Sequence, residues 1–340
     1  MRSYADFLEQ TVVVFEDQED PNDPRLKNLI LPYDSGIFEL DIAIVGIPFD
    51  LGVKNSNGRE GAARAPDAIR RQLRKYGTAY NIVRDADLAA LSIADFGNIK
   101  AVNDMAEMHL RVTGVLKKLF EIAGAVIVLG GGNDLTFATV RALAQSARER
   151  DKQSAVYGIN VDAHLDVRMP RYGKINSGMP YRMLIEEGII KGENLFEIGI
   201  QGHVNSKTYY DWAKHRGVKI WPLQQMRNRP WAPLASFRAR LDAESEQRGI
   251  ASFVSIDIDS VAQAFAPGSS APSPDGLFPH EILEISYLAG STIPGIRLLE
   301  IMEVNPIYDE GDRTSRLASN IILEFLAGRA VKKSSAGNSK

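Results

Sequence analysis

Short runs of apolar and β-branched residues alternate with longer segments of helical period along most of this 340-residue chain. This alternation is typical of a parallel sheet with helices on both faces. We expect strands over residues 41–47, 89–97, 125–130, 155–161, 195–200, 218–221, 252–258 and 296–304. We expect helices over residues 64–76, 103–122, 134–148, 205–216, 233–248, 279–290 and 312–328, and several of them open with Asn, Asp or Pro suited to a first helical turn.

These elements predict one domain, because neither an internal repeat nor a linker interrupts their alternation. We expect a single three-layer α/β/α domain over residues 39–330, built around a mainly parallel sheet of eight strands. Two smaller domains that meet near residue 150 are the alternative for a chain of this length. Residues 1–38 are polar and contain proline, which predicts an irregular arm packed on the body, and residues 331–340 are predicted to form a disordered tail.

The composition narrows the range of partners. A formal charge of -3 and a pI near 6.0 argue against a nucleic-acid binder. No apolar run approaches the roughly 18 residues of a membrane span, and the N-terminus lacks the apolar core of a signal peptide, so we expect a cytoplasmic protein without a membrane partner. Cysteine is absent, which excludes disulfides and thiolate metal sites. The expected partner is a small molecule or another subunit.

Polar residues stand directly after several predicted strands, where an open parallel sheet binds its ligands. Asp162, His164 and Asp166 in "DAHLD" alternate along an extended backbone, so their side chains project from one side toward a common point. Asp257 and Asp259 repeat this spacing after another strand. Five potential metal ligands therefore collect at two strand ends.

Carboxylates with one imidazole suit Mn²⁺ or a similar dication better than structural zinc. Four buried aspartates would repel one another, and two dications would supply the missing positive charge. Taken alone, an Asp-x-Asp pair is more often a turn or a helix cap, and an isolated His164 is more often a structural histidine. Because both pairs follow apolar runs at strand ends, we favour metal binding.

The motifs "GGGND" at 130–134, "DAHLD" at 162–166, "SIDID" at 255–259 and "EVNP" at 303–306 resemble those of the ureohydrolase superfamily of arginases, agmatinases and formimidoylglutamases. The resemblance extends from Ile44 to about Leu326. It implies an arginase-like α/β fold and a centre of two manganese ions per subunit that activates a bridging hydroxide.

The resemblance also assigns roles to individual residues. It implies that Asp162 and Asp257 bridge both ions, that Asp166 completes the first site, and that His164 and Asp259 complete the second. Glu303 of "EVNP" would hold the amidine or guanidine cation of the substrate. We expect Glu303, His164 and Asp166 to be the catalytic residues.

The "GGGND" motif departs from the family pattern, which normally has a histidine ligand where this chain has Asn133. An amide oxygen is a weaker donor than imidazole, so we expect Asn133 to ligate the first ion but to hold it less tightly. Asp134 is expected to cap the helix that starts at 135, and the alternative is that it turns toward the ions.

Within the superfamily, the flanking residues most resemble those of formimidoylglutamase. They are "NGREGAARAPDAIR" at 57–70, "DAHLDVR" at 162–168, "NSGMPYR" at 176–182, "GIQGHVNS" at 199–206 and "APGSSAPSPDGL" at 266–277. This resemblance implies hydrolysis of N-formimidoyl-L-glutamate to L-glutamate and formamide. We expect Arg168, Arg182, Asn176 and Ser177 to bind this small acidic amidine, although either arginine taken alone is more often part of a surface ion pair.

Two rival functions remain open. One is a guanidino-acid hydrolase of the arginase or agmatinase kind, which releases urea. The other is a ureohydrolase fold that has lost catalysis through Asn133 and binds a ligand or partner. The family commonly forms trimers or hexamers, so the resemblance implies a homo-oligomer.

Overall fold

The central sheet has ten strands in the part of the chain that the structure describes, residues 4–11, 20–32, 39–75, 77–245 and 249–337 of a computed structural model. Eight strands correspond to the predicted ones: β3 (Leu40–Gly46), β6 (Ile93–Ile99), β7 (Ala123–Leu129), β8 (Ala155–Val161), β9 (Leu195–Ile200), β10 (Lys219–Pro222), β11 (Ile250–Asp257) and β12 (Ile296–Met302). Two further strands are β1 (Leu8–Glu9) and β2 (Ile30–Pro32). The sheet order is β1-β6-β3-β7-β12-β11-β8-β9-β10, with β2 also paired to β6. Every pair in this sheet is parallel except β1 with β6, as expected for a mainly parallel sheet.

The prediction of eight strands is wrong by two short strands from the N-terminal segment. β1 (Leu8–Glu9) and β2 (Ile30–Pro32) come from the segment predicted to be an irregular arm, and both add to β6. Strands of two or three residues are too short to show a period in the sequence, so only their partner strand reveals them. Residues 1–3, 12–19 and 33–38 of the predicted arm lie outside the described residues.

Strand β6 begins later than predicted. Residues Leu88–Ala90 form a 3-10 helix instead, and the side chain of Asp87 accepts a hydrogen bond from the backbone N–H of Ala89. A short hairpin of β4 (Tyr80–Asn81) and β5 (Ala86–Asp87) precedes this turn. The hydrogen bond of the capping aspartate therefore favours a 3-10 helix here, although the apolar residues predicted a strand.

The seven predicted helices are all present. They are α3 (Ala65–Lys75), α4 (Met105–Ile122), α5 (Leu135–Arg150), α7 (Lys207–His215), α9 (Ala232–Ser245), α10 (Pro279–Ser291) and α11 (Arg313–Gly337). Residues 76 and 246–248, at two predicted helix ends, lie outside the described residues. Four short helices were not predicted: α1 (Leu26–Leu29), α2 (Leu51–Asn55), α6 (Pro180–Glu186) and α8 (Leu223–Asn228).

Helix α11 is longer than predicted. It continues through Gly337, into the segment 331–340 that was predicted to be disordered. Ala330 is buried at the start of this extension, and Lys332 and Lys333 are good helix formers, so the helix continues beyond the apolar pattern. Residues 338–340 lie outside the described residues.

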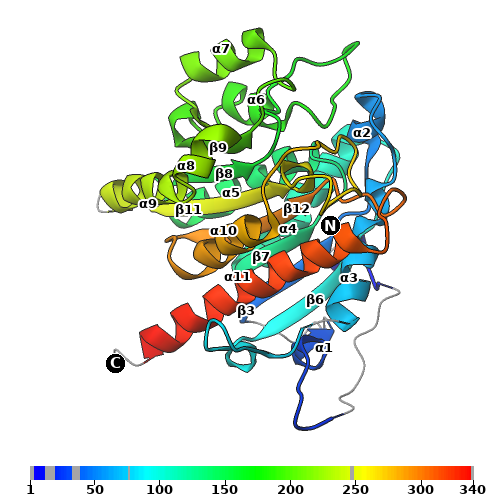
Figure 1. Ribbon diagram of the computed structural model, residues 1–340, viewed down its shortest axis with the longest axis vertical. Helices are drawn as coiled ribbons and strands as arrows, with labels where there is room; N and C mark the ends of the chain where they lie inside the picture. Colours follow the sequence, from blue (N-terminus) through cyan, green and yellow to red (C-terminus); the bar gives the residue numbers. More distant parts are fainter. Residues whose placement is uncertain (1–3, 12–19, 33–38, 76, 246–248, 338–340) are drawn as a thin grey trace.

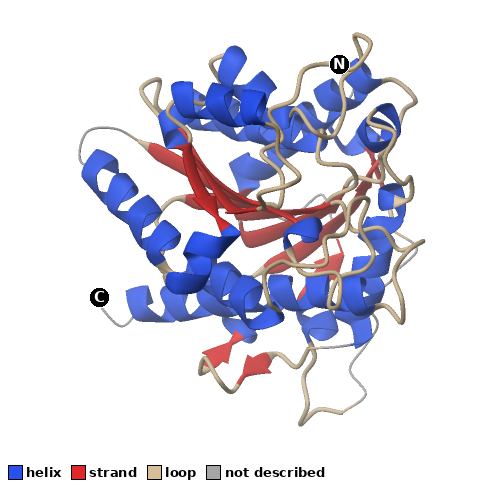
Figure 2. Ribbon diagram, turned by 45° about the horizontal axis from the view of Figure 1, so that its top comes forward, coloured by secondary structure: helices blue, strands red, loops and turns tan. Residues whose placement is uncertain are grey.

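Helices cover both faces of the sheet, which gives the predicted three layers (Figures 1 and 2). Side chains of α3, α8, α9, α10 and α11 pack with one face, and those of α4, α5, α6 and α7 pack with the other. Successive residues of β3 alternate between the two cores, with Ile42 and Ile44 in one and Ala43 and Val45 in the other. The strands are therefore apolar on both faces, and their polar residues stand at the strand ends.

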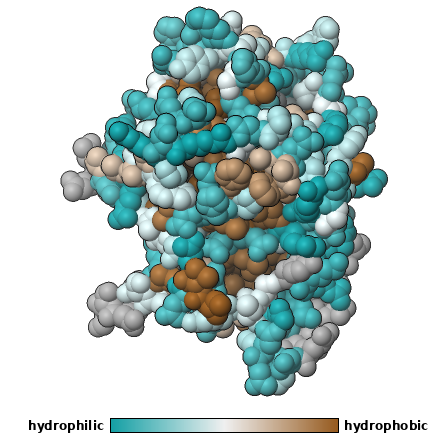
Figure 3. Space-filling view, in the orientation of Figure 1, coloured by the Kyte–Doolittle hydropathy of each residue, from teal (hydrophilic) through white to brown (hydrophobic). Residues whose placement is uncertain are grey.

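Hydrophilic side chains cover most of the molecular face shown in Figure 3, with separate hydrophobic patches between them. Ile82 and Val83, at the turn between β4 and β5, are each 83% exposed. Among the described residues, no helix is both long enough and apolar enough to cross a membrane.

Strand order brings the polar strand ends together. Strands β7, β12, β11 and β8 are consecutive neighbours in the sheet, and they run in parallel. Ile256 of β11 pairs with Val161 of β8, so the next residues, Asp257 and Asp162, follow side by side at the carboxyl edge. The loops after these four strands form the candidate site.

Candidate metal centre

Five side chains converge at the carboxyl edge of the sheet, as the sequence predicts. Among the described residues, one group consists of Asp162, His164 and Asp259, and a second consists of Asp162, Asp166 and Asp257. Within each group the potential ligand atoms all lie within 4.8 Å of one another. Asp162 belongs to both groups, so the two groups are adjacent and share one carboxylate.

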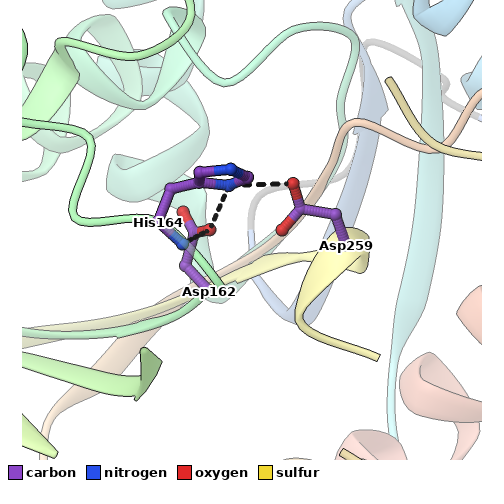
Figure 4. A group of neighbouring side chains, drawn as sticks. All are labelled: Asp162, His164 and Asp259. Atoms are coloured by element: carbon purple, nitrogen blue, oxygen red, sulfur yellow. Dashed lines mark hydrogen bonds and ion pairs between the residues drawn. The ribbon is translucent and has the colours of Figure 1, made fainter. Parts of the chain in front are cut away.

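Local turns set the direction of these side chains. The Asp162 Oδ1 atom accepts a hydrogen bond from the backbone N–H of His164 (2.7 Å), and the Asp257 Oδ1 atom accepts one from that of Asp259 (2.9 Å). This bond two residues along the chain is a turn that Asp favours. The His164 Nδ1 atom lies 3.0 Å from the Asp259 Oδ2 atom, so side chains from two strand ends face each other (Figure 4).

Two site residues have an unusual backbone conformation. Asp166 has φ of 45° and Glu303 has φ of 61°, in the left-handed region that residues other than glycine rarely adopt. A residue in this conformation lowers the free energy of unfolding by about 1–3 kcal/mol. Residues of this kind cluster at functional sites. Both carboxylates point into the site only because the surrounding structure holds their backbone in this region.

The acidic residues of the site are short of positive charge. Burial, and then the charges of Asp166 and Asp259, raise the pKa of Asp162 to about 8. Burial raises the pKa of Asp166 to about 6, and burial together with Asp259 raises the pKa of Asp257 well above its usual range. A cluster of this kind is stable in its charged form only with cations close to it.

The histidine responds to the same charges. Burial alone would lower the pKa of His164, but the carboxylates of Asp259 and Asp162 raise it well above its usual range.

Two carboxylate oxygens, Asp259 Oδ1 and Glu303 Oε2, are buried without a hydrogen-bond partner among the described residues. Unpartnered buried oxygens next to an imidazole are a donor set that fits hard to borderline dications such as Mn²⁺.

A cavity of about 250 Å³ opens onto these ligands. Its wall consists of site carboxylates, one histidine, one arginine and small polar residues: Ser56, Asn57, Gly58, His164, Asp166, Arg168, Ser177, Gly178, Asp257, Asp259, Ser270, Ala271 and Glu303. The side chains of Ser56, Asn57 and Ser270 were not predicted as site residues. Asn57 and Ser270 lie within "NGREGAARAPDAIR" and "APGSSAPSPDGL", so the unusual polarity of those segments was the available signal.

Comparisons with known proteins agree with this geometry. The model of the arginase family matches residues 40–328. This chain belongs to the arginase family. It is 30% identical to formimidoylglutamase of Bacillus subtilis over 326 residues, which cover 95% of this chain and 96% of that protein. It is 31% identical to proclavaminate amidinohydrolase of Streptomyces clavuligerus over 307 residues, with 87% and 90% covered.

A solved structure shows the same fold. Formiminoglutamase of Trypanosoma cruzi with Mn²⁺ is 30% identical, with a TM-score of 0.80 over 91% of this chain and 99% of that one. The predicted resemblance and the predicted fold class are therefore confirmed. This arginase-family chain is an enzyme, a hydrolase of carbon–nitrogen bonds.

Asn133 lies beside the group that consists of Asp162, Asp166 and Asp257 in this arginase-family site. Its Nδ2 atom donates to the Asp166 Oδ2 atom (2.7 Å), and its backbone N–H donates to the Glu303 Oε1 atom (2.8 Å). Its Oδ1 atom accepts a hydrogen bond from Thr136 (2.9 Å). The amide oxygen thus faces away from Asp166, and a rotation of the amide group would bring it to the position from which it could ligate an ion.

The prediction that Asp134 caps helix α5 is wrong. Asp134 stands at the N-cap position, but its side chain makes no capping hydrogen bond, and its backbone is already helical (φ −55°, ψ −27°) where a cap residue is normally extended. Its Oδ2 atom lies 3.3 Å from the Nε2 atom of buried His109. Neither group of potential metal ligands among the described residues includes Asp134, and its Oδ2 atom faces His109 instead.

Two of the five predicted substrate-binding residues, Arg182 and Asn176, are not in the wall of the cavity. The Nε atom of Arg182 donates to Val167 O (2.9 Å), its Nη1 atom bonds to Glu186 (2.6 Å), and its guanidinium lies over the ring of Trp212. The Oδ1 atom of Asn176 accepts from the backbone N–H of Gly178 (3.1 Å). Buried Arg182 and Asn176 therefore support the loop between them and the metal ligands.

The other three predicted substrate-binding residues, Arg168, Ser177 and Glu303, do line the cavity. Arg168 is exposed, and its guanidinium makes no hydrogen bond or ion pair with another described residue. The Ser177 Oγ atom lies 3.2 Å from the Ser56 Oγ atom, across the cavity mouth. Arg168 is thus a cation with donors available to a ligand.

Proposed function

We propose that this enzyme hydrolyses N-formimidoyl-L-glutamate to L-glutamate and formamide with two Mn²⁺ ions. The main support is the convergence of Asp162, His164, Asp166, Asp257 and Asp259 on one point beside a cavity with Glu303 and Arg168 in its wall. The similarity to formimidoylglutamases of Bacillus subtilis and Trypanosoma cruzi agrees with this substrate. An acidic floor and a basic rim suit a substrate that has a cationic amidine and carboxylates.

The five converging residues would hold the ions in two overlapping sets. Asp162, Asp166 and Asp257 form one set, to which Asn133 adds an amide, and Asp162, His164 and Asp259 form the other. Two dications held by these residues would supply a nucleophile at neutral pH, because the pKa of metal-bound water is lowered. They also relieve the repulsion that raises the pKa of Asp162 in the metal-free chain.

Glu303 binds the amidinium end of the substrate. Its Oε1 atom accepts a hydrogen bond from the backbone N–H of Asn133 (2.8 Å), which fixes the carboxylate, and its Oε2 atom is buried without a partner. Burial raises the pKa of Glu303 well above its usual range, and an amidinium beside it favours the charged form. The charge-assisted hydrogen bond then orients the carbon that is attacked.

Arg168 binds the carboxylate end of the substrate. Its guanidinium can accept a carboxylate in a bidentate arrangement, and the hydroxyls of Ser177 and Ser56 can donate to the same group. A substrate without a carboxylate, such as agmatine, gains nothing from this rim. The arginine therefore favours an acidic amidine or a guanidino acid over agmatine, whose far end is a cationic amine.

A substrate screen of the manganese-loaded enzyme tests the proposal. Formimidoylglutamate, arginine, agmatine and short guanidino acids are compared by kcat/KM, with formamide, glutamate and urea measured as products. We expect formimidoylglutamate to give the highest kcat/KM and to release formamide without urea. A higher value for a guanidino acid, with release of urea, would replace this proposal by a guanidino-acid hydrolase. No turnover of any substrate would instead support a binding protein.

The variant Arg168→Gln tests the acidic end. Loss of one charge-assisted hydrogen bond costs about 1.5–3 kcal/mol, so kcat/KM for formimidoylglutamate should fall by roughly 10- to 100-fold. Arg71→Gln, an exposed arginine of α3 outside the wall of the cavity, is the matched control and should change kcat/KM little. An unchanged kcat/KM in Arg168→Gln would remove Arg168 from the substrate site.

A further inference from the structure

A row of polar side chains crosses the sheet directly beneath the metal ligands. Glu300 of β12 pairs with Ser255 of β11, Ser255 pairs with Asn160 of β8, and Asn160 pairs with Glu197 of β9. All four residues are completely buried. Asn160 and Ser255 stand two residues before the ligands Asp162 and Asp257, so they lie on the same face of the sheet as those ligands.

Polar groups at this depth are unfavourable unless they have a role. The rest of this face is apolar, and the core there includes Val156, Phe253 and Leu298. Burial raises the pKa of Glu197 well above its usual range, and it also raises the pKa of Glu300. Apolar residues would pack here without the desolvation cost of these polar groups, so we infer that the row has a function.

Asn160 connects this row to the metal centre. Its Nδ2 atom lies 2.8 Å from the Glu197 Oε2 atom and 3.2 Å from the Asp162 Oδ2 atom, and its two amide hydrogens can serve both oxygens. The Asp162 Oδ1 atom accepts from the backbone N–H of His164 (2.7 Å). Each oxygen of Asp162 therefore has a hydrogen-bond donor, the His164 Nδ1 atom also lies 3.5 Å from Oδ1, and these contacts fix the plane of the carboxylate.

A second connection runs from the other end of the row. The Thr136 hydroxyl lies 2.7 Å from the Glu300 Oε1 atom and 2.9 Å from the Asn133 Oδ1 atom, while the Thr139 hydroxyl donates to the Glu300 Oε2 atom (2.6 Å). Glu300 thus holds the side chain that orients Asn133. Both ends of the row reach the metal centre through one intervening side chain.

We propose that Glu197 and Asn160 are positioning residues that orient Asp162 for both metal ions. Asp162 is the carboxylate that the two groups of ligands share, so a change in its orientation weakens both sites. Glu197 acts by accepting the hydrogen bond that keeps the Asn160 amide nitrogen turned toward Asp162. This inference rests on the proposed manganese dependence. Outer partners of this kind typically change metal affinity by about 10- to 100-fold when they are lost.

The test is a titration of the metal-free protein with Mn²⁺, followed by calorimetry and by the electron paramagnetic resonance spectrum of the ion pair. Asn160→Ala and Glu197→Leu are expected to weaken Mn²⁺ binding by about 10- to 100-fold and to alter the spectrum of the coupled pair. Glu197→Gln keeps an oxygen that accepts from Asn160, so it should bind Mn²⁺ within about threefold of the parent and keep the parent spectrum.

Asn194→Ala is the matched control. Asn194 is also a buried asparagine, but its Nδ2 atom donates to Val156 O (3.3 Å), near the opposite end of β8. This variant should lower the melting temperature and leave Mn²⁺ affinity unchanged. Equal losses of affinity in Asn194→Ala and Asn160→Ala would overturn the proposal, because the effect would then be general destabilisation.

Two other results separate the hypotheses. Parent-like Mn²⁺ affinity in folded Asn160→Ala and Glu197→Leu would overturn the positioning role, as would a loss in Glu197→Gln as large as that in Glu197→Leu. Failure of the parent protein to bind two Mn²⁺ ions would contradict the proposed function itself. The parent titration therefore comes first.

Discussion

The metal-free protein should lose stability as the pH rises, which is the reverse of ordinary acid denaturation. The cause is Asp162, whose pKa is raised from 3.8 to about 8 by burial and by the neighbouring carboxylates. In the native chain this carboxyl keeps a proton that the unfolded chain has released. Its contribution to stability is complete below the unfolded pKa and is lost as the pH rises toward the folded pKa.

The size of the effect follows from that single proton. When the native state holds one more proton than the unfolded state, the free energy of unfolding falls by about 1.4 kcal/mol for each pH unit. Between about pH 5.5 and 7.5, Asp162 therefore accounts for a loss of about 3 kcal/mol. His164 acts in the same direction, because its raised pKa gives stability that disappears as the pH rises through the folded value.

The assay is thermal unfolding of protein stripped of metal by a chelator, at constant ionic strength across this pH range. A loss of about 3 kcal/mol corresponds to a fall in Tm of roughly 4 °C for a chain of 340 residues, whose unfolding entropy is about 0.7 kcal/mol per kelvin. Asp162→Asn cannot titrate at this position and should show a clearly smaller slope. With saturating Mn²⁺ the slope should reverse, because metal binding requires deprotonated ligands. A metal-free Tm that stays constant or rises with pH, or an unchanged slope in Asp162→Asn, would refute this reasoning.

Three further variants test other parts of the site. Asp257→Ala should abolish binding of the ion pair and turnover while the circular dichroism spectrum stays that of the parent, and retained activity would contradict the two-metal proposal. Asn133→His should tighten the first Mn²⁺ ion in the same titration, since imidazole is the stronger donor, and an unchanged affinity would show that position 133 is not a ligand. Arg182→Gln should lower the free energy of unfolding, measured by chemical denaturation, by about 1–3 kcal/mol, because its buried hydrogen-bond partners are left unsatisfied. Its Mn²⁺ affinity should be unchanged. A loss of Mn²⁺ affinity without a loss of stability would indicate that Arg182 belongs to the site.

The sequence by itself determined the main strands and helices, and it identified the five side chains that converge as potential metal ligands. Period and strand-end position depend on residues that are close along the chain, so "DAHLD" and "SIDID" already showed which carboxylates point to one place. The family motifs added Glu303 as the proposed site for the substrate cation. The homo-oligomer stays a prediction.

Only the tertiary structure determined which hydrogen-bond and ion-pair partners the polar side chains have. Asp134 faces His109 instead of capping a helix, and Arg182 is bonded to Val167 and Glu186 instead of lining the cavity. The row that contains Asn160 exists only because four strands, distant in the sequence, pair in one register. A local pattern fixes the face on which a side chain stands, whereas its hydrogen-bond partner depends on which buried groups the folded chain brings within about 3 Å.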